Sequence, residues 1–277
     1  MRAAGMMRRI AIWIAIAAAS ATANGQERLE LVDSANYYIK ENRLPDAERC
    51  LKSALRMEPG SRQNALLLSN LGLVQAGLGK WDEALESYSV GLNISPSSTV
   101  LLTNRGGLFL EMNRPEECIA DLTRALEIDS TLMRPRLLRA TCNMMREDFK
   151  GAEKDLNVLV CDTTKDDVLL AMLAQCKEIS GNRQGAEALI ERAIKASPSP
   201  RYYYDLGRML ILDEDFDKSR SIVNEGIDKY PDSGELYLLR GYIHRKRFLP
   251  AEAQADREIA LRKGVDERLV DAWIPKK

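Results

Sequence analysis

The sequence predicts an all-α fold, an α-solenoid of about seven helix hairpins that ends in a short C-terminal capping helix. One observation is a repeat of close to 34 residues in the spacing of small side chains, at Ala47, Ala84, Cys118, Ala152, Ala186, Ser219 and Ala253. Another is that prolines follow the expected end of four second helices, at Pro59, Pro96, Pro198 and Pro231. A third is composition, because 45% of the 277 residues are hydrophobic, which excludes a disordered or collagen-like chain.

The first 23 residues have the pattern of an export signal. Basic residues in the first nine positions precede an apolar run from Ile10 to Ala19, and an A-x-A cleavage site follows at 21–23. The run is shorter than the ~20 apolar residues that span a bilayer. We expect cleavage before Asn24 and a periplasmic or secreted protein without stable membrane insertion. An uncleaved membrane anchor is the alternative.

Each copy of the repeat is expected to form two antiparallel helices. In the second copy, Leu68 and Leu71 recur at helical spacing before the small residue Ala84, and Leu85 and Leu92 recur after it. Small residues let two helix backbones approach closely. One hairpin cannot bury its apolar face alone, so neighbouring hairpins must stack.

This pattern resembles the tetratricopeptide repeat family. The resemblance covers about residues 28–263, in seven copies that start near 28, 65, 99, 133, 167, 200 and 234. The second copy carries the family pattern best, with Leu71-Gly72, Ala84, Tyr88 and Pro96. Leu159 at a small position and Arg257 at a core aromatic position depart from it.

Residues 264–277 follow the last copy. Gly264 is expected to break the final repeat helix, and Asp266 to Ile274 to form a short terminal helix. Leu269 and Trp273 are four residues apart on one face of that helix, so they are expected to cover the last exposed apolar surface.

Composition and motifs argue against catalysis and against several ligand classes. Forty basic and 41 acidic residues leave no basic excess for nucleic acid. His244 is the sole histidine, which excludes a multi-histidine metal site. The run Gly77-Leu78-Gly79-Lys80 lacks phosphate-loop spacing and is expected to be a turn between helices. We therefore expect no enzyme activity, no catalytic residue, no cofactor and no metal.

The five cysteines form no C-x-x-C motif, and their odd number leaves at least one unpaired within the chain. A disulfide among Cys142, Cys161 and Cys176 is one alternative. Buried apolar filler is the favoured interpretation, because free cysteine packs like a small hydrophobic residue.

The family resemblance implies a concave surface formed by the first helix of each copy, at repeat positions 2, 5, 6, 9, 12 and 13. Asn36, Asn70 and Asn104 lie there in the early copies, and an asparagine amide can bind a peptide backbone. An ordinary solvated polar face is the alternative. Met144 and Met145 make the middle copies apolar and adaptable, or belong to the core between repeats.

The late copies are basic and aromatic at the same positions. They carry Arg201, Tyr204, Arg208, Tyr242 and Arg245. Arginine and tyrosine are enriched at binding hot spots, and arginine binds carboxylates at two points. We expect this end to bind an acidic or C-terminal segment of a protein partner.

The sequence as a whole predicts an exported, non-enzymatic scaffold. Its partner would be a protein or peptide that binds in the concave groove of a superhelix. One role that this scaffold could have is the assembly of an envelope complex. An accessory subunit of an enzyme complex, or a carrier of an apolar ligand such as lipid, are the alternatives.

Overall fold

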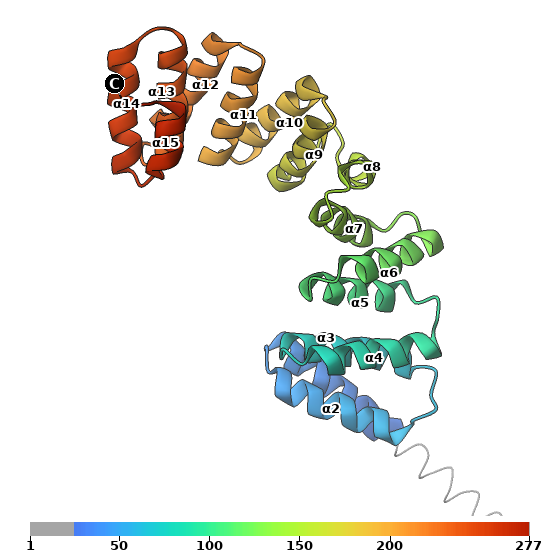
Figure 1. Cartoon of the computed structure of the whole chain (residues 1–277). Coiled ribbons are helices and arrows are strands. Elements are labelled where there is room, and N and C mark those ends of the chain that lie inside the picture. Colours follow the sequence, from blue (N-terminus) through green and yellow to red (C-terminus); the bar gives the residue numbers. More distant parts are fainter. Residues whose placement is uncertain (1–24, 277) are drawn as a thin grey trace, which may run out of the picture. The chain divides into compact units, whose positions relative to one another are not determined.

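The computed structural model describes residues 25–276, which are helices joined by short turns (Figure 1). The predicted export signal at 1–23 lies outside the described residues. A helix over 25–40 is followed by α2 (Leu44–Met57), α3 (Asn64–Gly77), α4 (Trp81–Ile94), α5 (Thr99–Glu111), α6 (Pro115–Ile128), α7 (Met133–Met145), α8 (Phe149–Leu159), α9 (Asp167–Ile179), α10 (Arg183–Ala196), α11 (Pro200–Leu212), α12 (Phe216–Lys229), α13 (Gly234–Lys246), α14 (Pro250–Arg262) and α15 (Glu267–Trp273). The predicted all-α repeat fold is confirmed.

The chain divides into two compact units between Arg146 and Glu147. The N-terminal unit contains the helix over 25–40 and α2 to α7, and the C-terminal unit contains α8 to α15. The boundary lies between the two helices of the fourth predicted copy, so each unit is described by itself.

In the N-terminal unit, α3 packs on α4 and α5 on α6 as hairpins, and α4 and α6 each pack on the next first helix. Small residues permit these contacts. A Cβ atom at Gly72 would lie 2.5 Å from the Tyr88 ring, and that ring is fully buried. The predicted turn between α3 and α4 is confirmed, with Gly79 at a φ of 74°.

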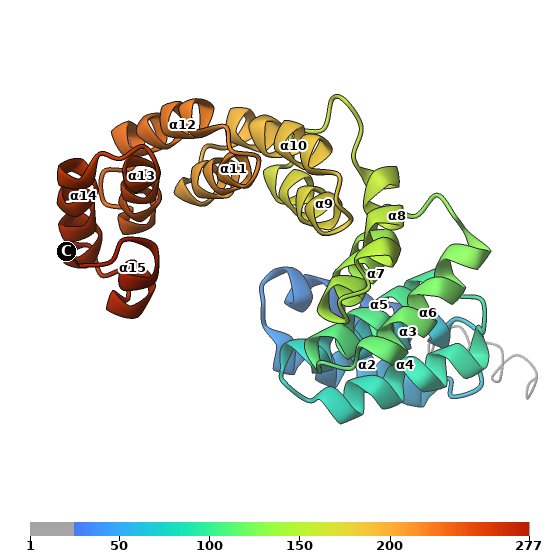
Figure 2. The same ribbon diagram turned by 45° about the horizontal axis from the view of Figure 1, so that its top comes forward.

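In the C-terminal unit, the hairpins α9–α10, α11–α12 and α13–α14 follow one another (Figure 2). The first helices α11 and α13 also contact each other directly, and α8, α10 and α12 each pack on the first helix that follows. Tyr203 and Leu206 of α11 are fully buried.

The expected capping helix is present as α15, which packs on α13 and α14. The face that packs agrees with the expectation for Trp273, which packs against the neighbouring core clusters, and differs from it for Leu269. Val270 and Ile274 are buried, whereas Leu269 is 42% exposed and Trp273 is half-buried. The unexpected Arg257 has a role here, because its buried guanidinium donates to the Ile274 carbonyl (3.2 Å) and pairs with Asp271.

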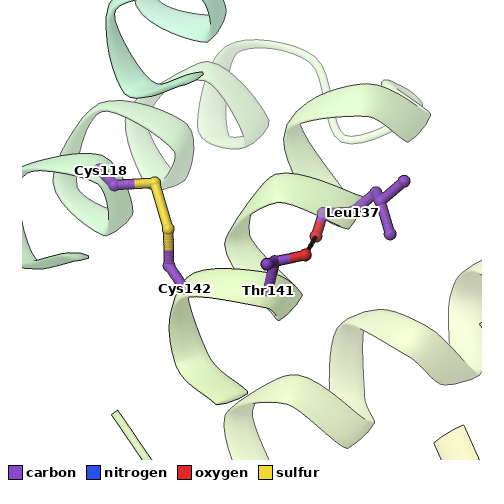
Figure 3. Close-up of a disulfide and its surroundings, with 4 residues drawn as sticks. All are labelled: Cys118, Leu137, Thr141 and Cys142. Carbon is purple, nitrogen blue, oxygen red and sulfur yellow. Dashed lines mark hydrogen bonds between the residues drawn. A yellow bond between two sulfur atoms is a disulfide. The ribbon is translucent and has the colours of Figure 1, made fainter. Parts of the chain in front are cut away.

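A disulfide joins Cys118 of α6 to Cys142 of α7 in the N-terminal unit (Figure 3). The interpretation of these two cysteines as unpaired filler was therefore wrong, and so was the choice of Cys142, Cys161 and Cys176 as candidates for pairing. Cys50 and Cys176 are buried free thiols, as the filler interpretation expects, and Cys161 is an exposed one.

Within residues 25–276, no helix combines the length and the hydrophobicity needed to cross a membrane. Among the same residues, no three histidine, cysteine or acidic side chains converge as metal ligands would.

Candidate functional site

A groove of about 560 Å³ lies in the C-terminal unit, lined by the first helices α9 and α11 and by two residues of α10. We call it the α9–α11 groove. Its lining residues are Val168, Ala171, Met172, Gln175, Glu178 and Ile179 from α9, Arg183 and Ile190 from α10, and Arg201, Tyr202, Asp205, Arg208, Met209 and Leu212 from α11.

The α9 residues of the groove form one continuous helix face. From Val168 to Ile179 they recur three and four residues further along the chain, as at 168, 171 and 172, which is the pattern of one side of an α-helix. They are also the positions 2, 5, 6, 9, 12 and 13 of the fifth copy, the set that the family resemblance implies.

Three large apolar side chains of the groove remain accessible to solvent. Val168 is 59% exposed, Ile179 is 53% exposed and Leu212 is 50% exposed. Exposed apolar side chains gathered in a hollow are typical of a surface that another molecule covers.

The charged groups of the groove are paired with one another. Arg208 Nη2 donates to Glu178 Oε2 at 2.8 Å, and this bond raises the pKa of Arg208. Arg201 Nε lies 3.7 Å from Asp205 Oδ2, and the Arg201 side chain is 78% exposed. Burial raises the pKa of Asp205. The third arginine of the lining, Arg183, donates from Nη1 to Asp213 Oδ1 at 2.7 Å, so each of the three arginines lies beside a carboxylate.

Tyr202 is fixed against α9. Its hydroxyl donates to Asp167 Oδ2 at 2.7 Å. Burial, together with this bond to a carboxylate, raises the pKa of Tyr202 to about 12. The phenol therefore stays protonated at neutral pH and joins α11 to α9 at this end of the groove.

A second pocket, of about 320 Å³, adjoins the groove and shares Arg208 and Leu212 with it. We call it the Trp273 pocket, and its lining residues are Arg208, Ile211, Leu212, Tyr242, Ala272 and Trp273. The rings of Tyr242 and Trp273 meet edge to face with centroids 5.0 Å apart. Arg245 Nη1 donates to the Trp273 carbonyl at 2.8 Å, which fixes the end of α15.

The late residues predicted for binding have different surroundings. Arg201 and Arg208 line the α9–α11 groove, and Tyr242 lines the Trp273 pocket. Tyr204 packs instead against the core around Tyr203, and burial raises its pKa. Arg245 donates to the Trp273 carbonyl, so it holds α15 in place and does not itself line the Trp273 pocket.

The early and middle predicted residues belong to the N-terminal unit and do not line this groove. Asn36 is exposed and Asn70 is half-buried. Asn104 Nδ2 donates to Ser69 Oγ at 3.1 Å, so one amide proton joins two neighbouring first helices. Met144 is half-buried and Met145 is 47% exposed at the end of α7. A ligand-binding role for these five residues stays a prediction.

Two residues that line the groove and the Trp273 pocket differ in whether the sequence could have predicted them. Leu212 occupies position 13 of the sixth copy, so the repeat spacing could have identified it. Trp273 lies beyond the last copy, and no repeat position predicts that α15 places its ring beside Tyr242.

Comparison with known families gives a match over more than half of the chain. Residues 32–99 and 180–234 match one sequence profile described as tetratricopeptide repeat, and residues 100–132 match a second with the same description. Residues 133–179 and 235–277 lie outside both matches, and the first of these stretches contains Leu159, which departs from the repeat pattern.

Hsc70-interacting protein 1 of Drosophila melanogaster is 32% identical over 110 residues, which are 39% of this chain and 29% of that protein. The match thus spans under a third of that relative. A crystal structure of a tetratricopeptide repeat protein from Parabacteroides merdae is similar, with a TM-score of 0.60, 23% identity, and coverage of 90% of this chain and 98% of that one.

The structure of YrrB, described as a repeat protein of the same kind with an unusual peptide-binding site, aligns with a TM-score of 0.58 and 16% identity. That alignment covers 67% of this chain and 96% of YrrB. At these identities both structures establish similarity of fold.

Proposed function

We propose that this chain, which belongs to the tetratricopeptide repeat family, is a scaffold that binds an extended peptide segment of a partner protein in the α9–α11 groove. Proteins with such repeats bind protein or peptide partners, and the proposal assigns this chain's site to a particular face. It goes beyond family membership because it names the helices that contact the peptide.

The observation that carries the proposal is the exposure of Val168, Ile179 and Leu212 inside the groove. Completely covering a side chain of this size gains roughly 1.5–3 kcal/mol. Three half-exposed side chains therefore offer several kcal/mol to a bound peptide, less the cost of ordering that peptide.

The polar groups of the groove favour binding over chemistry. Arg208 pairs with Glu178, and Tyr202 bonds to Asp167, so these side chains are already fixed by their neighbours. Fixed donors and acceptors around an apolar floor give orientation and specificity to a ligand. We assign no reaction to the site.

The comparisons support the class of ligand. YrrB is described as having a peptide-binding site, and the Drosophila relative is named for its interaction with another protein. We transfer to this chain the class of ligand, a peptide segment, and not the identity of either partner.

The proposed place of action is outside the cytoplasm. It rests on the basic residues, the apolar run at 10–19 and the A-x-A site at 21–23. We propose that the exported repeat protein serves there to assemble or retain a protein complex of the envelope.

The test is selection of random displayed peptides of about 12 residues, a length that spans about 40 Å when extended. The purified chain, Val168→Asp and Val158→Asp are compared. Val158 of α8 is the matched control, because it is 55% exposed and does not line the groove.

We expect the chain and Val158→Asp to enrich the same peptides. Val168→Asp should bind them at least about tenfold more weakly, a change of ~1.4 kcal/mol. No enrichment above that of an unrelated protein, or equal binding by Val168→Asp, would overturn the proposal.

A further inference from the structure

We infer that the Trp273 pocket receives one large apolar side chain of the bound peptide, and that Arg208 binds a carboxylate of an acidic residue close to it in that peptide. This rests on the proposed function and specifies its ligand as an apolar–acidic peptide segment. It also gives α15 a second role beyond capping the repeats.

The size and lining of the pocket favour a single side chain. Its volume of about 320 Å³ lies at the lower end of the roughly 300–1,000 Å³ of ligand pockets. Ile211, Leu212, Ala272 and the two rings make its walls apolar. The ring pair already has edge-to-face geometry, and a third ring or a branched aliphatic group extends such packing well.

The wall formed by α15 is held in place before any ligand arrives. Val270 and Ile274 are buried against the neighbouring helices. Arg245 and Arg257 donate to the carbonyls of Trp273 and Ile274 at 2.8 and 3.2 Å. A wall fixed in this way lowers the ordering cost of binding.

The positive charges at the Trp273 pocket favour an acidic residue next to the apolar residue of the peptide. Arg208 is its charged lining residue, and no acidic side chain of the described chain lines it, while Glu178 and Asp205 lie beside Arg208 on the side of the α9–α11 groove. Lys246 Nζ lies 5.4 Å from the centroid of the Tyr242 ring, which adds a second positive charge nearby. An acidic group of the ligand is therefore favoured at this point, and a basic one is disfavoured.

Arg208 can bind a ligand without losing its internal partner. A guanidinium has five N–H donors, and Glu178 accepts from Nη2. Since Arg208 lines both hollows, its side chain marks where a peptide passes from the α9–α11 groove into the Trp273 pocket.

The test uses a fluorescent synthetic copy of the most enriched displayed peptide and two matched substitutions. Ala272→Glu adds a carboxylate at the pocket, and Ala255→Glu adds the same group on α14. Both alanines are exposed on helix surfaces, so both variants should fold normally. Circular dichroism and unfolding curves verify this.

We expect enriched peptides to contain an aromatic or large aliphatic residue beside an aspartate or glutamate. Replacing either by alanine should weaken binding about tenfold or more. Ala272→Glu should weaken it similarly, Ala255→Glu should change it less than twofold, and salt should weaken it through screening.

The outcomes separate this inference from the proposed function. Enriched peptides that depend on Val168 but bind Ala272→Glu normally, or that lack the apolar–acidic pair, would overturn the inference and leave the groove proposal standing. Failure to enrich any peptide would overturn both.

Discussion

Arg105 and Asp121 form a two-point ion pair across the α5–α6 hairpin. Arg105 Nε lies 2.7 Å from Asp121 Oδ2, and Nη2 lies 2.8 Å from Oδ1. The third arm of the guanidinium, Nη1, donates to Ser89 Oγ of α4 at 3.0 Å. One side chain therefore joins three successive helices of the N-terminal unit.

The same arrangement occurs in the C-terminal unit. Arg240 of α13 bonds to both oxygens of Asp256 on α14, at 3.0 and 2.7 Å, and to Asn224 Oδ1 on α12 at 3.2 Å. Each arginine stands directly before the small residue, where the second, fifth and sixth copies have leucine, as in Leu71-Gly72. Polar pairing thus replaces apolar packing at one repeat position.

Removing one partner of this pair should destabilise the chain substantially. The Asp121 side chain is 9% exposed, so Asp121→Ala leaves the Arg105 charge half-buried without its carboxylate. We expect a loss of about 3 kcal/mol in the free energy of unfolding of the N-terminal unit, measured by urea denaturation.

Glu116→Ala is the control for that loss. Glu116 pairs with Arg146 at 3.2 Å, but both side chains are exposed, Glu116 at 67% and Arg146 at 45%. Its loss should cost less than ~1 kcal/mol. Equal effects of the two substitutions would contradict a structural role for the Arg105–Asp121 pair.

Adding one methyl group at Gly72 should be destabilising although alanine is the better helix former. The new Cβ would lie 2.5 Å from the buried Tyr88 ring, and overpacking costs about 1–3 kcal/mol. Gly107→Ala in α5 is the control, since its nearest neighbour would be 3.8 Å away. Gly107→Ala should be neutral or stabilising by up to ~1 kcal/mol. A stabilised Gly72→Ala would contradict the close helix contact.

The five cysteines should react in three groups with a thiol reagent. In the native protein Cys161 alone is exposed, so one thiol should react. Denaturation without a reductant should release Cys50 and Cys176, giving three thiols, and reduction should give five. Five reactive thiols in the denatured, unreduced and air-oxidised protein would show that Cys118 and Cys142 are not joined.

The reaction of Cys161 should also have a characteristic pH dependence. Hydrogen bonds from the Thr163 and Thr164 hydroxyls lower its pKa to about 7. Because the thiolate is the nucleophile, the alkylation rate should rise with pH and reach half its maximum near pH 7. Thr163→Val should move that midpoint upward, and an unchanged midpoint would contradict the assignment.

The export signal makes a prediction that mass spectrometry can check. When the chain is produced in bacteria with its own N-terminus, the mature protein should begin at Asn24 and be recovered outside the cytoplasm. Ala23→Arg should block cleavage, because the cleavage site requires a small residue. Recovery of uncleaved wild-type chain in the cytoplasm would contradict export.

The repeat spacing predicted most of the fold because it reports helix ends and close contacts directly. Pro59, Pro96, Pro198 and Pro231 each stand two residues after the last residue of a second helix, as a residue that ends helices should. Gly72 and Ala84 predicted the contact of α3 with α4, because bulky residues would keep two helices apart.

Features outside the repeat could not be predicted in the same way. The cysteine expectation compared equivalent positions in adjacent copies, such as Cys142 and Cys176. Packed helix axes are about 8–10 Å apart, so equivalent residues on neighbouring first helices rarely reach disulfide distance. Cys118 and Cys142, on sequential helices and 24 residues apart, have Cα atoms 6.9 Å apart.

Only part of the candidate site could be predicted, because the repeat-position rule applies only to residues within the repeat helices. The position rule identified Arg201 and Arg208 because it describes one face of a repeat helix. It also selected Tyr204, whose partly buried ring packs against the core around Tyr203 instead of lining the groove. It missed Trp273, which comes from a helix that no repeat contains.

The binding of a peptide in the α9–α11 groove is tested most directly by site-specific photocrosslinking to the enriched peptide. A photoreactive benzoylphenylalanine is placed at Ile179 in the groove or at Val158 on α8, both exposed. We expect a strong crosslink from position 179 and a background signal from position 158. Crosslinks that are equal, or stronger from position 158, would contradict the account.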